Sequence, residues 1–128
     1  MNFYSQIMKI KERPGVWIGD LSLENMKRFL DGVTFCMENN NIDDYFVTVF
    51  KKYFNWYVNY ELLKMNISDE QRAKLAVNNS RDFCQLIPIV QTDTKNQIDI
   101  FFELFESFHE AYIKGNDFDD IIHFFIKD

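Results

Sequence analysis

Apolar side chains recur every three or four residues along most of the chain, a spacing typical of helices that bury one face. Turn and capping residues divide this pattern into six segments. We therefore expect helices at about 2–12, 22–37, 43–65, 68–88, 94–114 and 118–126. Only the stretch 86–90 resembles a strand, and Pro88 weakens that interpretation. The sequence thus predicts an all-α fold, a compact single-domain bundle of about six helices over residues 1–128.

The ends of the expected helices are marked by prolines, glycines and small polar residues. Pro14 and Gly15 end the first helix, because the residue before a proline avoids the α conformation. Ser22 and Ser68 are good N-caps, since a serine hydroxyl accepts a hydrogen bond from a free N–H of the first turn. Pro88 either kinks or ends the fourth helix.

Aromatic residues dominate the side chains that could form a core. The 128 residues include 14 Phe, 6 Tyr and 2 Trp, together 17% of the chain. Each aromatic side chain buries a large area, so we expect an aromatic-rich core. Val16, Trp17 and Ile18 form a short apolar segment that we expect to insert into this core as an ordered loop. Gly32 lies inside the second helix, where it indicates the close approach of another backbone.

The charge balance excludes some partners. The chain carries 20 acidic and 14 basic residues, a net charge of −6. Such a surface repels nucleic-acid phosphates and anionic lipid headgroups and attracts basic proteins, so we expect no direct nucleic-acid partner and no membrane. Cys36 and Cys84 lie in largely apolar helical patterns, and we expect two free, buried thiols. Residues 1–11 have no apolar segment typical of a signal peptide, which predicts a cytoplasmic protein. Nothing in the sequence indicates an oligomeric state.

No pattern typical of catalysis or of metal binding occurs in the sequence. His109 begins a stretch similar to the HExxH zinc motif, but Ile113 stands where the second histidine ligand should be. The other histidine is His123, and we expect both to be partly exposed helix residues. Adjacent carboxylates such as Asp43–Asp44 do not oppose each other across a cleft, as glycoside hydrolysis requires. We therefore expect no catalytic residues, no metal, no cofactor and no enzymatic activity.

The segment 94–114 separates aromatic from acidic side chains most clearly. At about 100° per residue, one side of this helix carries Phe101, Phe105, Phe108 and Tyr112, which we expect in the core. The opposite side carries four carboxylates, which we call the acidic stripe: Asp99, Glu103, Glu106 and Glu110.

Like charges at this spacing destabilise an isolated helix by about 0.2–0.5 kcal/mol per pair. The acidic stripe is therefore either an ordinary solvated surface or a surface that binds a basic partner. Three further acidic residues near the last helix complete the candidate partner-binding set: Asp117, Asp119 and Asp120.

The first quarter of the chain resembles a known family. Its residues 11–19 read KERPGVWIG, and they are followed by Ser22-Leu23, Met26, Phe29-Leu30 and Gly32. This pattern is similar to the "RPGMYIG…S…L..FL.GY" signature of small bacterial helical proteins that act as immunity proteins in contact-dependent growth inhibition and other polymorphic toxin systems. The chain departs from the signature at Trp17, where tyrosine is usual, and at Val33, which replaces the tyrosine after the glycine.

The resemblance implies a helical protein that binds and neutralises one cognate toxin C-terminal domain. Because toxins vary within such systems, the shared motif is more plausibly scaffold than toxin contact. We assign that structural role to Arg13, Pro14, Gly15, Trp17, Gly19 and Gly32. A basic, nuclease-type toxin would suit an acidic inhibitor that covers its active site or substrate groove.

Two other functions remain open. A helical adaptor or regulatory subunit would share every physical feature except the toxin. A small helical enzyme would need a deep pocket in which carboxylates converge on His109 or His123.

Overall fold

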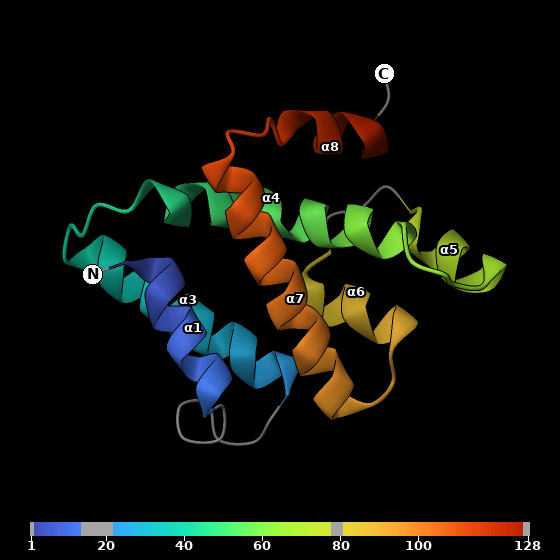
Figure 1. Ribbon diagram of the computed structural model, residues 1–128, viewed down its shortest axis with the longest axis horizontal. Coiled ribbons are helices and arrows are strands. Elements are labelled where there is room, and N and C mark those ends of the chain that lie inside the picture. The colour runs from blue at the N-terminus through green and yellow to red at the C-terminus, as the bar shows by residue number, and fades with distance from the viewer. Residues whose placement is uncertain (1, 14–21, 78–80, 127–128) are drawn as a thin grey trace.

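Seven α-helices account for most of residues 2–13, 22–77 and 81–126, the residues that the computed structural model describes (Figure 1). They are α1 (Phe3–Glu12), α3 (Leu23–Asn39), α4 (Tyr45–Leu63), α5 (Asp69–Leu75), α6 (Phe83–Val90), α7 (Thr94–Ile113) and α8 (Asp119–Phe125). These ranges contain no strand. The all-α prediction is confirmed. One hydrophobic cluster receives buried side chains from the first six of these helices and from Phe118, and Ile121 of α8 packs against it.

The fourth expected helix is two helices in the structure. Ser68 caps α5 as predicted, but α5 ends at Leu75 and α6 starts anew after Asp82. The Asp82 carboxylate accepts a hydrogen bond from the Gln85 N–H, and the Gln85 side chain accepts one from the Asp82 N–H. This reciprocal cap starts a helix at a point that apolar spacing alone does not mark. Pro88 does not end α6, which continues to Val90.

Helix α4 is the element on which most of the others pack. It contacts α1, α5, α6, α7 and α8, and Figure 1 shows α7 crossing it at a steep angle. Two polar contacts fix its neighbours. The hydroxyls of Tyr57 on α4 and Ser107 on α7 are hydrogen-bonded, and the Asn55 side chain accepts a hydrogen bond from the Phe83 N–H at the start of α6.

Phenylalanine rings fill the space between α1, α4 and α7. Phe3, Phe54, Phe101, Phe105 and Phe108 are all fully buried. The Phe105 ring lies within 5.5 to 6.1 Å, centroid to centroid, of six other rings: Phe3, Tyr4, Phe46, Phe50, Phe54 and Phe101. Aromatic pairs at these separations attract each other beyond the effect of area burial. The prediction of an aromatic-rich core is confirmed.

One carboxylate joins the starts of α1 and α4. An Asp44 oxygen accepts a hydrogen bond from the Phe3 N–H at 2.7 Å, and its other oxygen accepts one from the Phe46 N–H at 3.1 Å. Both N–H groups belong to first turns, where no helical carbonyl is available to them. Asp44 therefore caps both α1 and α4. Its position in the sequence, directly before α4, indicates only the second of these caps.

Two sequence-based expectations for α3 are wrong. Gly32 is exposed, and a Cβ built there would meet no described atom within 4 Å, so no part of the described backbone approaches it closely. Cys36 is exposed rather than buried, because it lies off the buried face of α3, formed by Leu23, Met26, Leu30, Thr34 and Met37. Both cysteines are free, as expected. Cys84 is half-buried, and burial raises the pKa of its thiol to about 12.

The family-like motif lies mostly outside the described residues. Pro14, Gly15, Trp17 and Gly19 fall there, as does the apolar segment 16–18, so their scaffold role stays a prediction. Arg13 is described: its side chain is exposed, and its backbone N–H closes α1 by donating to the Ile10 carbonyl.

The packing of Phe105 gives a direct test of this core. Phe105→Ala should lower the free energy of unfolding by about 3–5 kcal/mol, because the ring is fully buried among other rings. Phe35→Ala removes the same atoms from a residue that is 65% exposed, and it should change the free energy by less than about 0.5 kcal/mol. Urea denaturation measures both. Equal losses for the two variants would contradict the core described here.

Candidate partner-binding surface

The acidic stripe lies on α7 as the sequence predicts. Asp99, Glu103 and Glu110 are exposed, and Glu106 is half-buried. On the opposite side of the helix, Phe101, Phe105 and Phe108 are fully buried, and Tyr112 is half-buried. The buried aromatic rings thus fix which side of α7 is available to a partner.

Two of the four stripe carboxylates already form ion pairs. The Lys11 ammonium on α1 lies 2.9 Å from a Glu106 carboxylate oxygen, and the Lys114 ammonium lies 3.0 Å from a Glu110 oxygen. Hydrogen bonding to Glu106 raises the pKa of Lys11. Glu106 therefore contacts the end of α1, although an ion pair this exposed contributes little free energy. Asp99 and Glu103 form no ion pair with any described residue and carry the stripe's unmatched charge.

Sequence reasoning missed an apolar residue at the end of the acidic stripe. The four stripe carboxylates are spaced four, three and four residues apart, which keeps them on one side of α7. Ile113 follows Glu110 by three residues and therefore lies on the same side. Its side chain is 67% exposed. The signal was present in the sequence, because the position is on the polar side of the helix. We call Ile113 together with the acidic stripe the outer face of α7.

A partner that covers the outer face of α7 would meet charge along its length and an apolar contact at one end. Burying an exposed isoleucine stabilises a complex by about 1.5–3 kcal/mol at most. Another exposed side chain lies near this end of α7. The ring of Tyr45, at the start of α4, lies 6.5 Å from that of Tyr112. Tyrosine is enriched among the residues that dominate binding energy at interfaces.

The three aspartates near α8 are not joined to the acidic stripe by any hydrogen bond or ion pair among the described residues. Asp117 accepts a hydrogen bond from the Asp119 N–H at 2.9 Å. Asp119 accepts one from the Tyr53 hydroxyl at 2.7 Å, which raises the pKa of that tyrosine and fastens α8 to α4. Asp120 is exposed in the first turn of α8. Two of the three thus have local structural roles.

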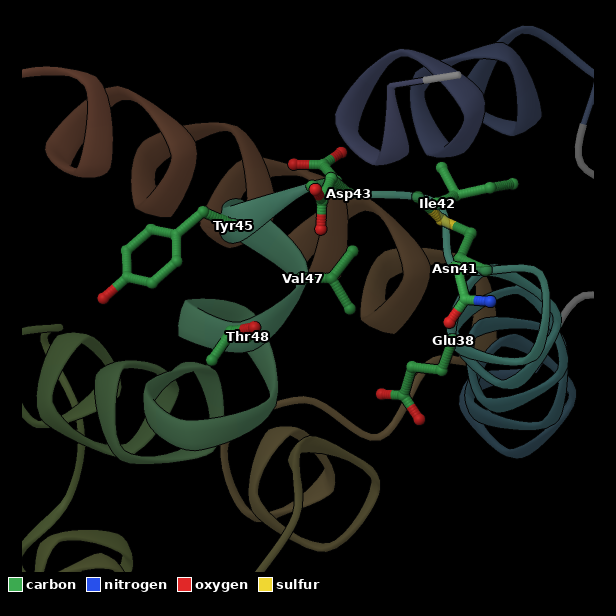
Figure 2. Close-up of a pocket in the computed structure, with 9 residues that line it drawn as sticks. Glu38, Asn41, Ile42, Asp43, Tyr45, Val47 and Thr48 are labelled. Carbon is green, nitrogen blue, oxygen red and sulfur yellow. The ribbon is translucent and has the colours of Figure 1, made fainter.

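A hollow of about 560 Å³ lies between the end of α3 and the start of α4 (Figure 2). Its lining includes three carboxylates. Asp44 uses both oxygens as helix caps, and Glu38 pairs with Lys51 at 2.6 Å, so only Asp43 has no such partner among the described residues. Figure 2 shows Glu38 and Tyr45 on opposite sides of the hollow. This region adds negative charge near Tyr45 but offers no convergent set of polar groups.

The two histidines have different surroundings. The His109 ring stacks on that of Tyr4, with centroids 3.6 Å apart and planes 10° from parallel, and it meets the Phe46 ring edge to face with centroids 4.9 Å apart. Burial lowers the pKa of His109, and the nearby Asp44 carboxylate raises it by a smaller amount. His123 is exposed. In the described ranges, no group of three or more His, Cys, Asp or Glu side chains is arranged to hold a metal ion.

The described residues thus form an all-α protein whose longest helix carries a row of carboxylates along its outer side. None of the described helices combines the length and the apolar character needed to cross a membrane. Comparison of the chain with protein-family models, with curated proteins and with solved structures finds no match.

The stacked position of His109 predicts a pH dependence of stability. Its pKa lies below the ordinary value of 6.5 in the folded protein, so the unfolded chain binds more protons as the pH falls through 6.5. Folding should therefore weaken between pH 7.5 and 5.5, and His109→Gln should reduce this loss. Urea denaturation at the two pH values measures it. His123→Gln replaces an exposed imidazole and should keep the full loss; equal behaviour of the two variants would contradict this assignment.

Proposed function

We propose that this protein is an immunity protein that binds a cognate bacterial toxin C-terminal domain in the cytoplasm and neutralises it. The outer face of α7 covers the active site or substrate groove of a basic, nuclease-type toxin. No covalent chemistry is needed, because inhibition comes from occlusion.

The observation that carries this proposal is the composition of the outer face of α7. Four carboxylates occupy successive turns of one helix, and an exposed isoleucine ends the row. Neighbouring carboxylates raise the free energy of the isolated helix, and a basic partner relieves that repulsion. Negative charge on the inhibitor also speeds its encounter with a positively charged toxin.

The resemblance of residues 11–32 to the immunity-protein signature supports a bacterial toxin as the partner. The physical features of α7 suit any basic protein, and the adaptor interpretation rests on the same surface. The two functions differ in their biological partner, so a test of toxin neutralisation separates them.

The test uses the cognate toxin domain, sought first in the gene immediately upstream of this chain. Co-expression should restore growth, and the two purified proteins should form a complex. Asp99→Lys combined with Glu103→Lys reverses the unmatched charge of the outer face without touching the ion pairs of Glu106 and Glu110. Association of this variant with the toxin should slow by about tenfold or more at low salt, with a weaker dependence on salt concentration.

A matched control separates the outer face from net charge. Glu24→Lys combined with Glu70→Lys makes the same change in total charge at exposed positions on α3 and α5, where it removes exposed ion pairs to Arg28 and Lys74 that contribute little free energy. This control should associate faster than the outer-face variant. Equal slowing by the two variants would assign the effect to overall charge, and a toxin that is neither bound nor neutralised would contradict the proposed function.

A further inference from the structure

A second hollow lies between the last turns of α4, helix α5 and the end of α8. It has a volume of about 480 Å³, within the range of about 300–1,000 Å³ typical of small-molecule sites. Figure 1 shows α8 lying alongside α4 on the side of the molecule away from α1 and α3. The hollow is lined by Tyr60, Leu63, Lys64, Arg72, Ala76, Phe124 and Phe125.

The walls of this hollow are aromatic and aliphatic. The rings of Tyr60 and Phe124 meet edge to face at 5.3 Å, and Phe124 is 49% exposed. Val77 and Ile126 each directly follow a lining residue, and both are exposed as well. Half of the six large apolar side chains that are exposed in the described residues therefore line the hollow or directly follow a lining residue. Of these, only Phe124 lines the hollow itself, and an exposed aromatic ring in a largely apolar lining is typical of binding sites.

The charge of the lining is opposite to that of the protein. The chain has a net charge of −6, yet Lys64 and Arg72 are the charged residues among the described lining residues, with the Glu61 carboxylate beside Lys64. Arg72 donates one N–H to the Leu63 carbonyl at 2.7 Å, which holds its guanidinium near α4. A guanidinium has five N–H donors, so the others can serve an anion.

Lys64 is held at the same hollow by weaker contacts. Its ammonium lies 4.4 Å from the centre of the Tyr60 ring and 3.3 Å from a Glu61 carboxylate oxygen. That ion pair is exposed, and exposed pairs contribute little free energy. A carboxylate that also contacts Arg72 can therefore replace Glu61 as the partner of Lys64.

We propose that this hollow binds an amphipathic carboxylate of the size of a medium-chain fatty acid. The alkyl chain lies against Tyr60, Leu63 and Phe124, and the carboxylate lies at the rim with Arg72 and Lys64. Among the described residues the rim carries two cations and one neighbouring carboxylate, Glu61, so its net positive charge favours an anionic head group over a cationic one of the same length. The site is separate from the outer face of α7 and does not depend on the proposed function.

Nuclear magnetic resonance titration with sodium decanoate, below its micelle-forming concentration, tests the proposal on the full chain. Decanoate should shift the amide resonances of the lining residues and the indole resonance of Trp56, whose ring lies 5.6 Å from that of Phe125. Decyltrimethylammonium carries the same chain with the opposite charge, and it should bind about tenfold more weakly or not at all. Equal binding of the two compounds, or shifts confined to other faces, would overturn the proposal.

Variants of the rim and wall complete the test. Lys64→Gln and Arg72→Gln should each weaken decanoate binding by about tenfold, as loss of a charged hydrogen-bond donor does. Phe124→Ala should also weaken decanoate binding, because it removes an exposed wall of the hollow. Lys27→Gln, on α3, should leave binding unchanged. Arg72→Gln could also disturb the contact of α5 with α4, so Lys64→Gln is the deciding variant. Undiminished decanoate affinity in Lys64→Gln would overturn the proposed carboxylate site.

Discussion

The packing of phenylalanines from α7 against α4 is the constraint on which the rest of the structure depends. Phe105 and Phe108 are fully buried, and their rings contact aromatic rings from α1, α4 and the turn before α8. A helix that buries one side in such a core exposes its other side to solvent. The exposure of the acidic stripe therefore follows from the core, and the surface proposed to meet a partner lies on the other side of the same helix.

Helix α1 closes this arrangement and borders the outer face of α7. Its start is tied to α4 through Asp44, its middle stacks Tyr4 on His109, and its end pairs Lys11 with Glu106. Only the last of these contacts uses a stripe carboxylate. The proposed partner surface and the contact with α1 thus share Glu106, whereas Asp99 and Glu103 form no ion pair to α1. The hollow near α8 lies in another part of the fold and adds a separate surface.

Local patterns predicted most of the helices and the two sides of α7, because helical spacing and capping depend on residues close in sequence. Local patterns failed for features that depend on contacts between residues far apart in the sequence. Lys11 and Glu106 are 95 residues apart, so no spacing rule indicates their pairing. Gly32 has an exposed position that depends on which face of α3 the bundle covers. The break between α5 and α6 shows that apolar periodicity can continue across two helices. The hollow near α8 is formed by three helices, so the pattern within any one of them does not indicate it.

Ile113 offers the most direct measurement of the central claim that the outer face of α7 binds the partner. Its methyl groups can be observed with and without the toxin domain while a soluble paramagnetic agent reports solvent exposure. Ile126 is exposed beyond the end of α8 and serves as an internal reference. The account predicts that toxin binding shields Ile113 and leaves Ile126 accessible. An Ile113 that stays as accessible in the complex as in the free protein would contradict it.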